Sequence, residues 1–231
     1  MKHVKNSFPP GTVGIPTGLQ PRFWEFIDAV GTLEVPEGTM VRRASSCDIT
    51  FNVNRIIGVM KGDWVFFVDD DHQFPPDTLM RLLSHAYAPK SRVDVVSPIN
   101  VAKGAPFYPI VFHGANDPRG PLWPYYRWEE LSGCGLFALP KGDVVGRSGM
   151  LVKRHVFDAI GYPWVKCGQI SPGFLGEDWH FCREIQNIGY TIWIDRDQVL
   201  DHITYGVVQA RRAANGVYRP GFYPLVRTNA D

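Results

Sequence analysis

Three adjacent carboxylates, Asp69 to Asp71, directly follow "WVFFV" at residues 64–68, one of the most apolar short runs in the chain. Neighbouring negative charges repel one another, and burial raises the cost of keeping them ionised. In an extended segment alternate side chains share a face, so Asp69 and Asp71 are expected to point together and Asp70 away. Two carboxylates in one crevice suit Mg²⁺ or Mn²⁺, which takes further ligands from water and substrate phosphates. The run therefore predicts a metal site for a phosphorylated substrate; the alternative is a solvated acidic turn before a helix.

A second carboxylate pair, Glu177 and Asp178, begins the segment "GEDWHFCREIQNIG" at residues 176–189. Helical spacing puts Asp178 on the face of Cys182 and Ile185, which is the expected buried stripe. A carboxylate there is costly unless it is paired or does chemistry. Asp178 is therefore a candidate general base, and Glu177 could hold an acceptor or fix a loop. The alternative is that Asp178 only stabilises the first turn of the helix.

These residues must be positioned by strands that alternate with helices. The expected strands are 12–18, 39–45, 63–69, 93–98 and 190–195, and the expected helices are 20–31, 48–62, 75–86 and 176–189. Asp48 is the expected N-cap of the second helix. The alternation predicts an α/β fold with a mostly parallel central sheet flanked by helices, and ligands bind beyond the carboxyl ends of such strands. Pro, Gly and aromatic residues crowd 104–128, which predicts loops and a small antiparallel β element near the active site.

Composition limits the remaining classes of function. The chain has 231 residues, 45% of them hydrophobic, and a net charge of +1, so no overall field indicates nucleic acid or membrane as a partner. Four scattered cysteines favour a reduced, cytoplasmic protein, and no apolar run approaches the ~20 residues of a membrane span. One domain is expected over 1–208. The extension 209–231 contains Arg211, Arg212, Arg219, Arg227 and three aromatic residues, and is expected to be a lid or an interaction arm, or a tail packed on the surface.

The arrangement of strand, "DDDHQFPP" and helix resembles the family 2-like glycosyltransferases of the GT-A fold, in which a DxD motif binds metal and the nucleotide-sugar diphosphate. The resemblance runs from about Thr12 to Val208. It continues through "GIPTG", "NVNRII", "VGRSGMLVKRHVFDAIGYPW", "GEDWHFCREIQNIGY" and "LDHITY", in the order that the family has them.

This resemblance implies a GT-A, Rossmann-like fold and transfer of a sugar from a nucleotide-diphosphate sugar, with UDP favoured, to a hydroxyl acceptor. It implies Mn²⁺ or Mg²⁺ held by Asp69, Asp71 and His202, and Asp178 as the base of an inverting enzyme, with Glu177 beside it. The donor would be bound by Pro16, Thr17, Gly18, Asn54, Arg55, Asp69, Asp70, Arg147 and Gly149. For the acceptor, the sequence itself offers Glu177 and the aromatic side chains Trp123 and Trp164 as sugar platforms.

Two alternatives remain open beside this reading. A sugar nucleotidyltransferase needs a glycine-rich loop with a basic residue after the first strand, and "IPTGLQPR" is a poor version of it. A non-catalytic carbohydrate-binding protein of the same fold is opposed by the intact motifs. His72, His113, His155 and His180 are interpreted as surface or packing residues. The acceptor is open between a glycan, a lipid-linked sugar, a protein and a modified nucleic acid, and the sequence does not indicate the oligomeric state.

Overall fold

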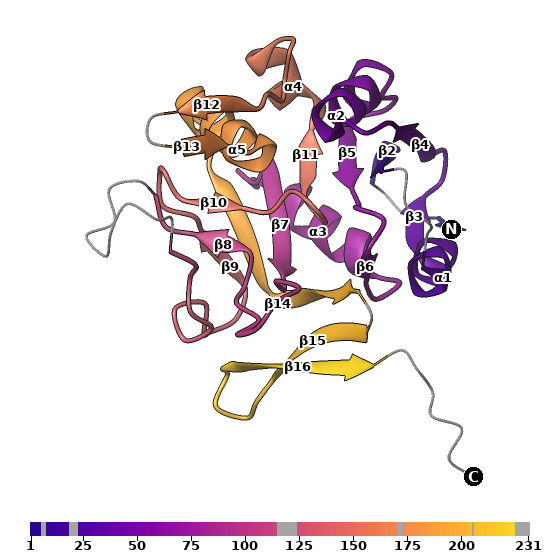
Figure 1. The fold of residues 1–231 in the computed structure, drawn as a ribbon. Helices are drawn as coiled ribbons and strands as arrows, with labels where there is room; N and C mark the ends of the chain where they lie inside the picture. The colour runs from indigo at the N-terminus through magenta and orange to yellow at the C-terminus, as the bar shows by residue number, and fades with distance from the viewer. Residues whose placement is uncertain (6–7, 19–22, 115–123, 171–172, 205, 225–231) are drawn as a thin grey trace.

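The computed structural model describes residues 1–231 except 6–7, 19–22, 115–123, 171–172, 205 and 225–231. A large mixed β-sheet runs through the centre of the molecule, with helices on both faces (Figure 1). From one edge to the other its strands are β16 (Tyr218–Pro224), β15 (Gly206–Arg212), β14 (Ile192–Ile203), β7 (Val95–Asn100), β11 (Leu151–Lys153), β5 (Trp64–Phe67), β2 (Thr12–Thr17) and β4 (Met40–Ser45).

Two groups of parallel strands lie on either side of β11 in this sheet. Strands β4, β2 and β5 are parallel to one another, and β7 is parallel to β14. Strand β11 lies between β5 and β7 and is antiparallel to both. The chain leaves β7 at its carboxyl end and is still at that edge at Arg147 and Ser148, so β11 has to run back in the opposite direction. The predicted α/β class is confirmed, but the sheet is mixed rather than mostly parallel, because β11, β15 and β16 all pair antiparallel with their neighbours.

Five helices cover the two faces of the sheet within the described residues. Strand β5 alternates between the faces, with Val65 and Phe67 on one side and Trp64 and Phe66 on the other. The first face packs against α2 (Ile49–Gly58), α4 (Arg154–Ile160) and α5 (Glu177–Asn187). The second packs against α1 (Trp24–Thr32) and α3 (Thr78–Ala86). The burial of both faces explains why β5 is apolar at every position.

The local helix signals are confirmed at α2 and wrong in one detail at α3. The Asp48 side chain caps α2 by accepting a hydrogen bond of 3.1 Å from the backbone N–H of Phe51. Helix α3 begins at Thr78 and has Asp77 at its N-cap, so Pro75 and Pro76 precede the helix and do not lie in its first turn.

Short strands complete the site. Strand β8 (Val111–Phe112) pairs antiparallel with β10 (Val144–Val145), and β9 (Leu136–Ala138) pairs antiparallel with β14. Strand β6 (His72–Gln73) also pairs antiparallel with β14, and this register makes His72 and His202 direct partners. Two further small sheets pair β1 (Lys2–Val4) with β3 (Glu34–Pro36) and β12 (Gly168–Ile170) with β13 (Gly173–Leu175).

The C-terminal segment continues the main sheet. Strand β15 pairs with the end of β14 and forms a hairpin with β16 (Figure 1). The expected boundary between 208 and 209 falls inside β15, and the Tyr218 ring contacts Trp128 with 5.3 Å between centroids. The hairpin is therefore docked on the body of the protein, and its function as a lid or arm stays a prediction. Residues 225–231, which include Arg227, lie outside the described part.

Candidate active site

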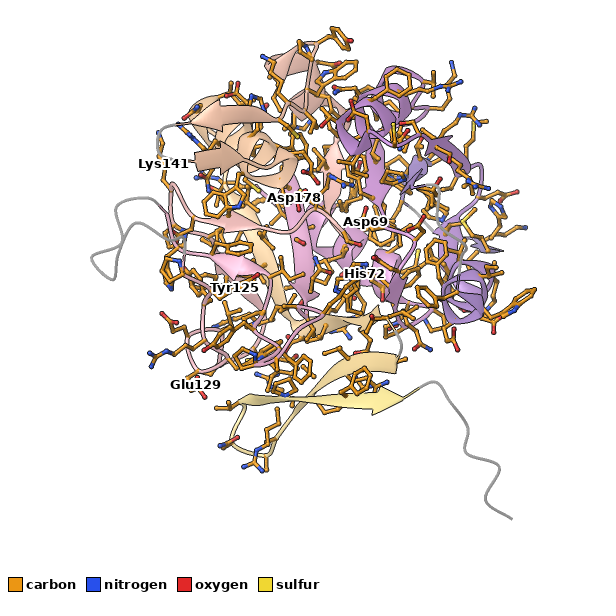
Figure 2. All side chains as sticks on the ribbon, in the orientation of Figure 1. Asp69, His72, Tyr125, Glu129, Lys141 and Asp178 are labelled. Atoms are coloured by element: carbon orange, nitrogen blue, oxygen red, sulfur yellow. The ribbon has the colours of Figure 1, made fainter. Side chains whose placement is uncertain are left out.

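A cavity of about 430 Å³ lies beyond the carboxyl ends of β2, β5 and β7. This is the edge at which an open α/β sheet binds its ligands. Around it gather most of the acidic and basic residues that the sequence singled out, with Asp69, His72 and Asp178 labelled in Figure 2. Among the predicted residues, the cavity is lined by Pro16, Gly18, Asp69, Asp70, Asp71, Arg147, Asp178 and His202.

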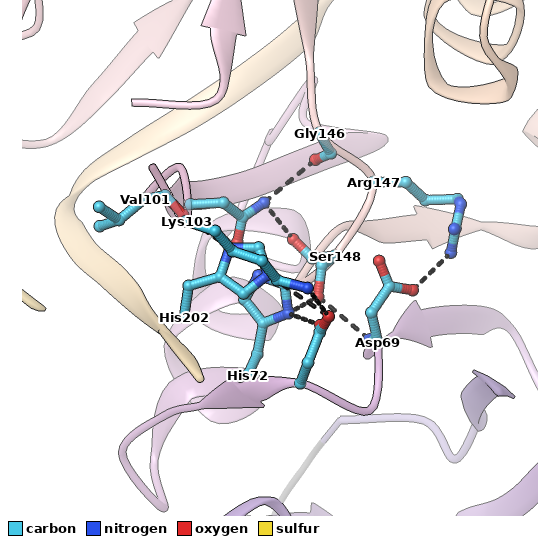
Figure 3. Close-up of polar contacts among 10 residues, drawn as sticks. Asp69, His72, Val101, Lys103, Gly146, Arg147, Ser148 and His202 are labelled. Carbon is cyan, nitrogen blue, oxygen red and sulfur yellow. Dashed lines mark hydrogen bonds and ion pairs between the residues drawn. The ribbon is translucent and has the colours of Figure 1, made fainter. Parts of the chain in front are cut away.

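Asp71, His72 and His202, which all line this cavity, form a compact cluster, and Figure 3 labels its two histidines. His72 Nδ1 is 3.0 Å from Asp71 Oδ1, and His202 Nε2 is 3.5 Å from Asp71 Oδ2. The imidazole rings stack with 4.1 Å between centroids, and one ligand atom from each of the three residues lies within 4.8 Å of the others. The pairing of β6 with β14 creates this cluster by setting the histidines opposite each other.

A hydrogen bond fixes the tautomer of His202. His202 Nδ1 is 2.7 Å from the Val101 carbonyl oxygen, which can only accept, so Nδ1 carries the proton and Nε2 keeps a lone pair. His72 Nδ1 lies 3.0 Å from Asp71 Oδ1 and 3.2 Å from Ser148 Oγ, and its Nε2 is buried without a hydrogen-bond partner in the described part of the chain. The Nε2 lone pair of His202 and the unpartnered Nε2 of His72 thus lie near one carboxylate, and this set of donors suits a divalent metal.

The charges of the cluster agree with this assignment. Burial lowers the pKa of His202, so its ring is neutral at pH 7 although Asp71 is adjacent. Burial alone would raise the pKa of Asp71, but the contacts with His202 and His72 hold it well below its usual range. The ionised carboxylate of Asp71 and the neutral ring nitrogen of His202 both direct lone pairs toward the cavity. A cation bound between them would offset this concentration of negative charge.

Lys103 currently supplies the nearest positive charge. Its Nζ is 2.6 Å from Asp71 Oδ2, and its side chain is 48% exposed. A lysine at this place competes with a metal for the same oxygen. It comes from the loop that follows β7, so it can leave without disturbing the core.

Replacement of this lysine gives a direct test of the competition. The variant Lys103→Met is expected to bind Mn²⁺ about two- to fivefold more tightly in the absence of nucleotide, which is the scale of one exposed ion pair. Calorimetric titration with MnCl₂ measures the change, and Lys61→Met, which changes an exposed lysine outside the cavity lining, is the matched control. Weaker Mn²⁺ binding in Lys103→Met would show that the lysine supports the site.

Asp69 points to a different partner from Asp71. Its Oδ1 is 3.2 Å from Arg147 Nη1, and its backbone N–H donates to Ser148 Oγ at 3.1 Å. Strand β5 ends at Phe67 and a turn follows at residues 70–71, so the extended geometry expected for 69–71 is wrong; Asp69 and Asp71 both line the cavity but contact different partners. His72 occupies the place beside Asp71 and His202 that was expected for Asp69.

A buried arginine connects Asp69 with Asp178. Arg147 is 2% exposed, its Nε lies 3.5 Å from Asp178 Oδ1, and its guanidinium lies over the Phe67 ring at 5.4 Å. Burial raises the pKa of Asp178 to about 7; the Arg147 charge opposes the rise, and Glu177 and Asp69 add to it. Both carboxylates keep the pKa of Arg147 above its usual value in spite of burial. Asp178, in the first turn of α5, is therefore a carboxylate that can exchange a proton near neutral pH.

Several predicted donor residues have structural contacts. The Asn54 amide bridges α2 to the following loop: Nδ2 donates to the Val165 carbonyl at 2.7 Å, and Oδ1 accepts from the Trp164 backbone N–H at 3.0 Å. Arg55 is exposed on α2, outside the cavity lining. Buried Thr17 donates its hydroxyl hydrogen bond to the Ala44 carbonyl at 3.2 Å.

Three further predicted residues also lie outside the cavity lining. Gly149 has φ +78°, and a Cβ there would come within 2.5 Å of Pro98 Cγ, so its glycine is required by packing. The Trp164 indole N–H donates to the Phe157 carbonyl at 2.9 Å, and Glu177 Oε2 is 3.9 Å from Cys167 Sγ. Trp123 lies outside the described residues.

Sequence reasoning missed four residues that line the cavity: His72, Asn100, Lys103 and Ser148. His72, interpreted as a surface or packing residue, has a buried ring that lies next to Asp71 and His202. Its position directly after "DDD" was a usable signal. Asn100 ends β7, and its side chain donates to the Ser148 carbonyl at 2.8 Å. A polar residue at the carboxyl end of a buried strand is a sequence signal that could have identified Asn100.

Within the part of the chain that the structure describes, no helix combines the length and the hydropathy needed to cross a bilayer.

Part of the chain is similar in sequence to a known protein family, and the fold is similar to solved structures. The sequence model of glycosyl transferase family 2 matches residues 38–139, and no curated protein matches the sequence. The solved structure of A197 from STIV has a TM-score of 0.51 and 12% identity, covering 95% of this chain and 99% of that one. The structure of GalNAc-T7 with UDP, GalNAc and Mn²⁺ has a TM-score of 0.52 and 13% identity, covering 84% of this chain.

At these identities the two structures establish the fold alone, and this chain spans only 44% of the GalNAc-T7 chain. The activity class rests on the family match, whose residues include β5, the three aspartates and α3. Residues 38–139, somewhat less than half of the chain, are similar to glycosyl transferase family 2, and the fold is similar to that of the GT-A glycosyltransferase GalNAc-T7.

Proposed function

We propose that the protein transfers a sugar from a nucleotide-diphosphate sugar, with UDP as the favoured nucleotide, to a hydroxyl acceptor in a metal-dependent reaction that inverts the anomeric centre. The observation that carries this is a single cavity containing both the Asp71–His72–His202 cluster and the Arg147–Asp178 pair. The Asp71–His72–His202 cluster suits a cation that binds a diphosphate, and the Arg147–Asp178 pair suits proton transfer. GalNAc-T7, which shares the fold, was solved with UDP and Mn²⁺, and this supports the choice of donor.

The metal would be held by Asp71, His72 and His202. Two imidazoles beside one carboxylate suit a first-row transition metal better than Mg²⁺, so Mn²⁺ is the proposed cofactor. When bound, the metal acts as a Lewis acid that offsets the charge of the departing nucleoside diphosphate. Asp69, expected as a further ligand, is proposed instead to orient Arg147 through their ion pair.

The proposed donor residues fall into two groups, those that line the cavity and those that hold its walls in place. Pro16, Gly18 and Asp70 line the cavity and remain the proposed contacts for the nucleoside and sugar. Thr17, Asn54 and Gly149 are proposed to act indirectly, by shaping the walls. Once the donor is bound, the Lys103 ammonium would leave the Asp71 carboxylate and pair with a phosphate oxygen of the donor. The carboxylate and phosphate oxygens are both anionic and would lie at the same edge of the cavity.

Asp178 is the proposed general base. Its carboxylate takes the proton of the acceptor hydroxyl as that oxygen attacks the anomeric carbon from the face opposite the diphosphate, and this geometry inverts the centre. Arg147 keeps a share of the carboxylate ionised near pH 7, which burial alone would oppose. The cytoplasmic location and the nature of the acceptor stay predictions at this point.

The proposal is tested by calorimetric titration of the protein with UDP, GDP and CDP, in Mn²⁺ and then in EDTA. UDP is expected to bind with Mn²⁺ and to lose at least about tenfold in affinity in EDTA, because the diphosphate then meets Asp69–Asp71 without a neutralising cation. If none of the nucleotides binds in either condition, the cavity is not a donor site.

A further inference from the structure

A second cavity, of about 540 Å³, lies between the loop after β7 and the C-terminal hairpin. Trp128 and Tyr218 are buried and form its aromatic floor, with 5.3 Å between their ring centroids. Both rings are held by backbone carbonyls: the Trp128 indole N–H donates to Phe107 at 3.0 Å, and the Tyr218 hydroxyl donates to Arg196 at 2.7 Å. The floor is therefore a fixed surface rather than a gap between loose side chains.

The rim of this cavity has an excess of positive charge. Arg127 and Arg219 line it, and neither guanidinium has an ion-pair partner within the described residues. The neighbouring Arg211 and Arg212 differ, because they pair with Asp201 at 3.1 Å and Asp197 at 2.7 Å. One carboxylate, Glu129, also lines the rim, so two guanidinium groups face one negative charge. An arginine fork matches a carboxylate in two parallel hydrogen bonds, and a free pair of forks favours an anion.

An aromatic strip connects this second cavity with the active site. Tyr108 lines the second cavity, Tyr125 lines the first, and the two rings stack with 5.6 Å between centroids. Phe112 continues the strip from Tyr125, at 4.5 Å, to Trp179, at 5.3 Å. Trp179 directly follows Asp178, and in Figure 2 Tyr125 is drawn between Asp178 and Glu129. The strip therefore reaches the cavity of the proposed base through Tyr125 and the cavity of the arginine rim through Tyr108.

We propose that the second cavity is an acceptor subsite for an acidic sugar, and that the acceptor is an oligosaccharide bearing carboxylates that extends along the aromatic strip from Asp178. Sugar rings place their C–H faces on aromatic rings, and a carboxylate would be bound by Arg127 and Arg219. This rests on the glycosyl transfer proposed above, because only that reaction requires an acceptor hydroxyl next to Asp178. It also gives the C-terminal hairpin a function, since the hairpin supplies Tyr218 and Arg219.

The test uses tetragalacturonate and its full methyl ester, which have the same sugar backbone with and without charge. Binding of each to the whole protein is measured by calorimetry, for the native sequence, for the double variant Arg127→Gln/Arg219→Gln and for Arg92→Gln. Arg92 is an exposed arginine at the amino end of β7, at the opposite edge of the sheet, and makes a matched control. UDP binding with Mn²⁺ is measured on the same three proteins.

We expect tetragalacturonate to bind the native protein at least tenfold more tightly than the ester, and the double variant to lose this preference while Arg92→Gln keeps it. UDP binding should be equal in all three. Equal affinity for the two tetramers, no binding of either, or the same loss in Arg92→Gln would overturn the subsite. Preferred binding to phosphatidylglycerol vesicles, tested in parallel, would overturn it in favour of a membrane surface. Failure of UDP binding alone would count against the proposed donor reaction and leave the result on the acidic sugar standing.

Discussion

The variant Asp178→Asn is expected to lower kcat by about 10²–10⁴-fold while UDP affinity in Mn²⁺ stays within about twofold, because a positioned general base contributes on that scale. The amide has the size of the carboxylate but cannot take a proton from the acceptor. Arg147 keeps its second partner, Asp69, at 3.2 Å, so its buried charge remains paired. Transfer is measured as release of UDP in the presence of acceptor, and donor binding by calorimetry.

The pH profile identifies the base independently. The pKa of Asp178 is raised from its ordinary value to about 7, and only the ionised form accepts a proton. Transfer is therefore expected to level off above pH 7 and to fall about tenfold for each pH unit below it. The Glu177 charge adds to the raised pKa of Asp178, so Glu177→Gln should move the acid limb of the profile to lower pH. A limb that stays in place in Glu177→Gln would point to another titrating group.

The control for the substitution itself is Asp158→Asn, the same chemical change at an exposed position of α4. Its kcat should equal that of the native protein. If Asp178→Asn retained transfer, or if it lost UDP binding together with transfer, Asp178 would not be the base.

Local patterns were sufficient for most of the fold. The fully apolar run of β5, the aspartates after it and the 3.6-residue period of α3 each depend on neighbours within a few residues. The cap of α2 by Asp48 follows the same rule. These features determine which edge of the sheet holds the site and place Asp71 there, whereas His202 was expected at the metal site only from the family resemblance.

Long-range pairing determined the rest. His72 reaches His202 because β6 pairs with β14, and these strands lie about 130 residues apart in the chain, where no local period can report the register. The direction of β11 similarly depends on where the preceding loop ends. Arg147 was expected as a donor contact, but its burial between two carboxylates comes from three segments that meet only in the folded protein.

Loss of the metal site is the other large effect expected. Asp71→Asn should weaken Mn²⁺ binding by at least about a hundredfold, since even outer partners of metal ligands contribute 10- to 100-fold. His72→Asn should weaken it to a similar degree, because the buried, unpartnered Nε2 of His72 is assigned to the metal. Asp69→Asn should have a smaller effect, since Arg147 holds that carboxylate. Mn²⁺ affinity is measured by calorimetry, with the Mn²⁺-dependent rise in Tm as a second readout.

The ranking of these three variants distinguishes two metal sites that share Asp71 and His202. If Asp69 is the third ligand, as alternation along an extended strand predicted, Asp69→Asn would match Asp71→Asn and His72→Asn would bind Mn²⁺ normally. If the described geometry holds, the order is reversed, because β5 ends before the aspartates and the β6–β14 pairing brings His72 in their place. A normal Tm for each variant in EDTA would show that the difference lies in metal binding and not in folding. The order of the Mn²⁺ affinities therefore tests whether this chain builds its metal site from two histidines and one aspartate.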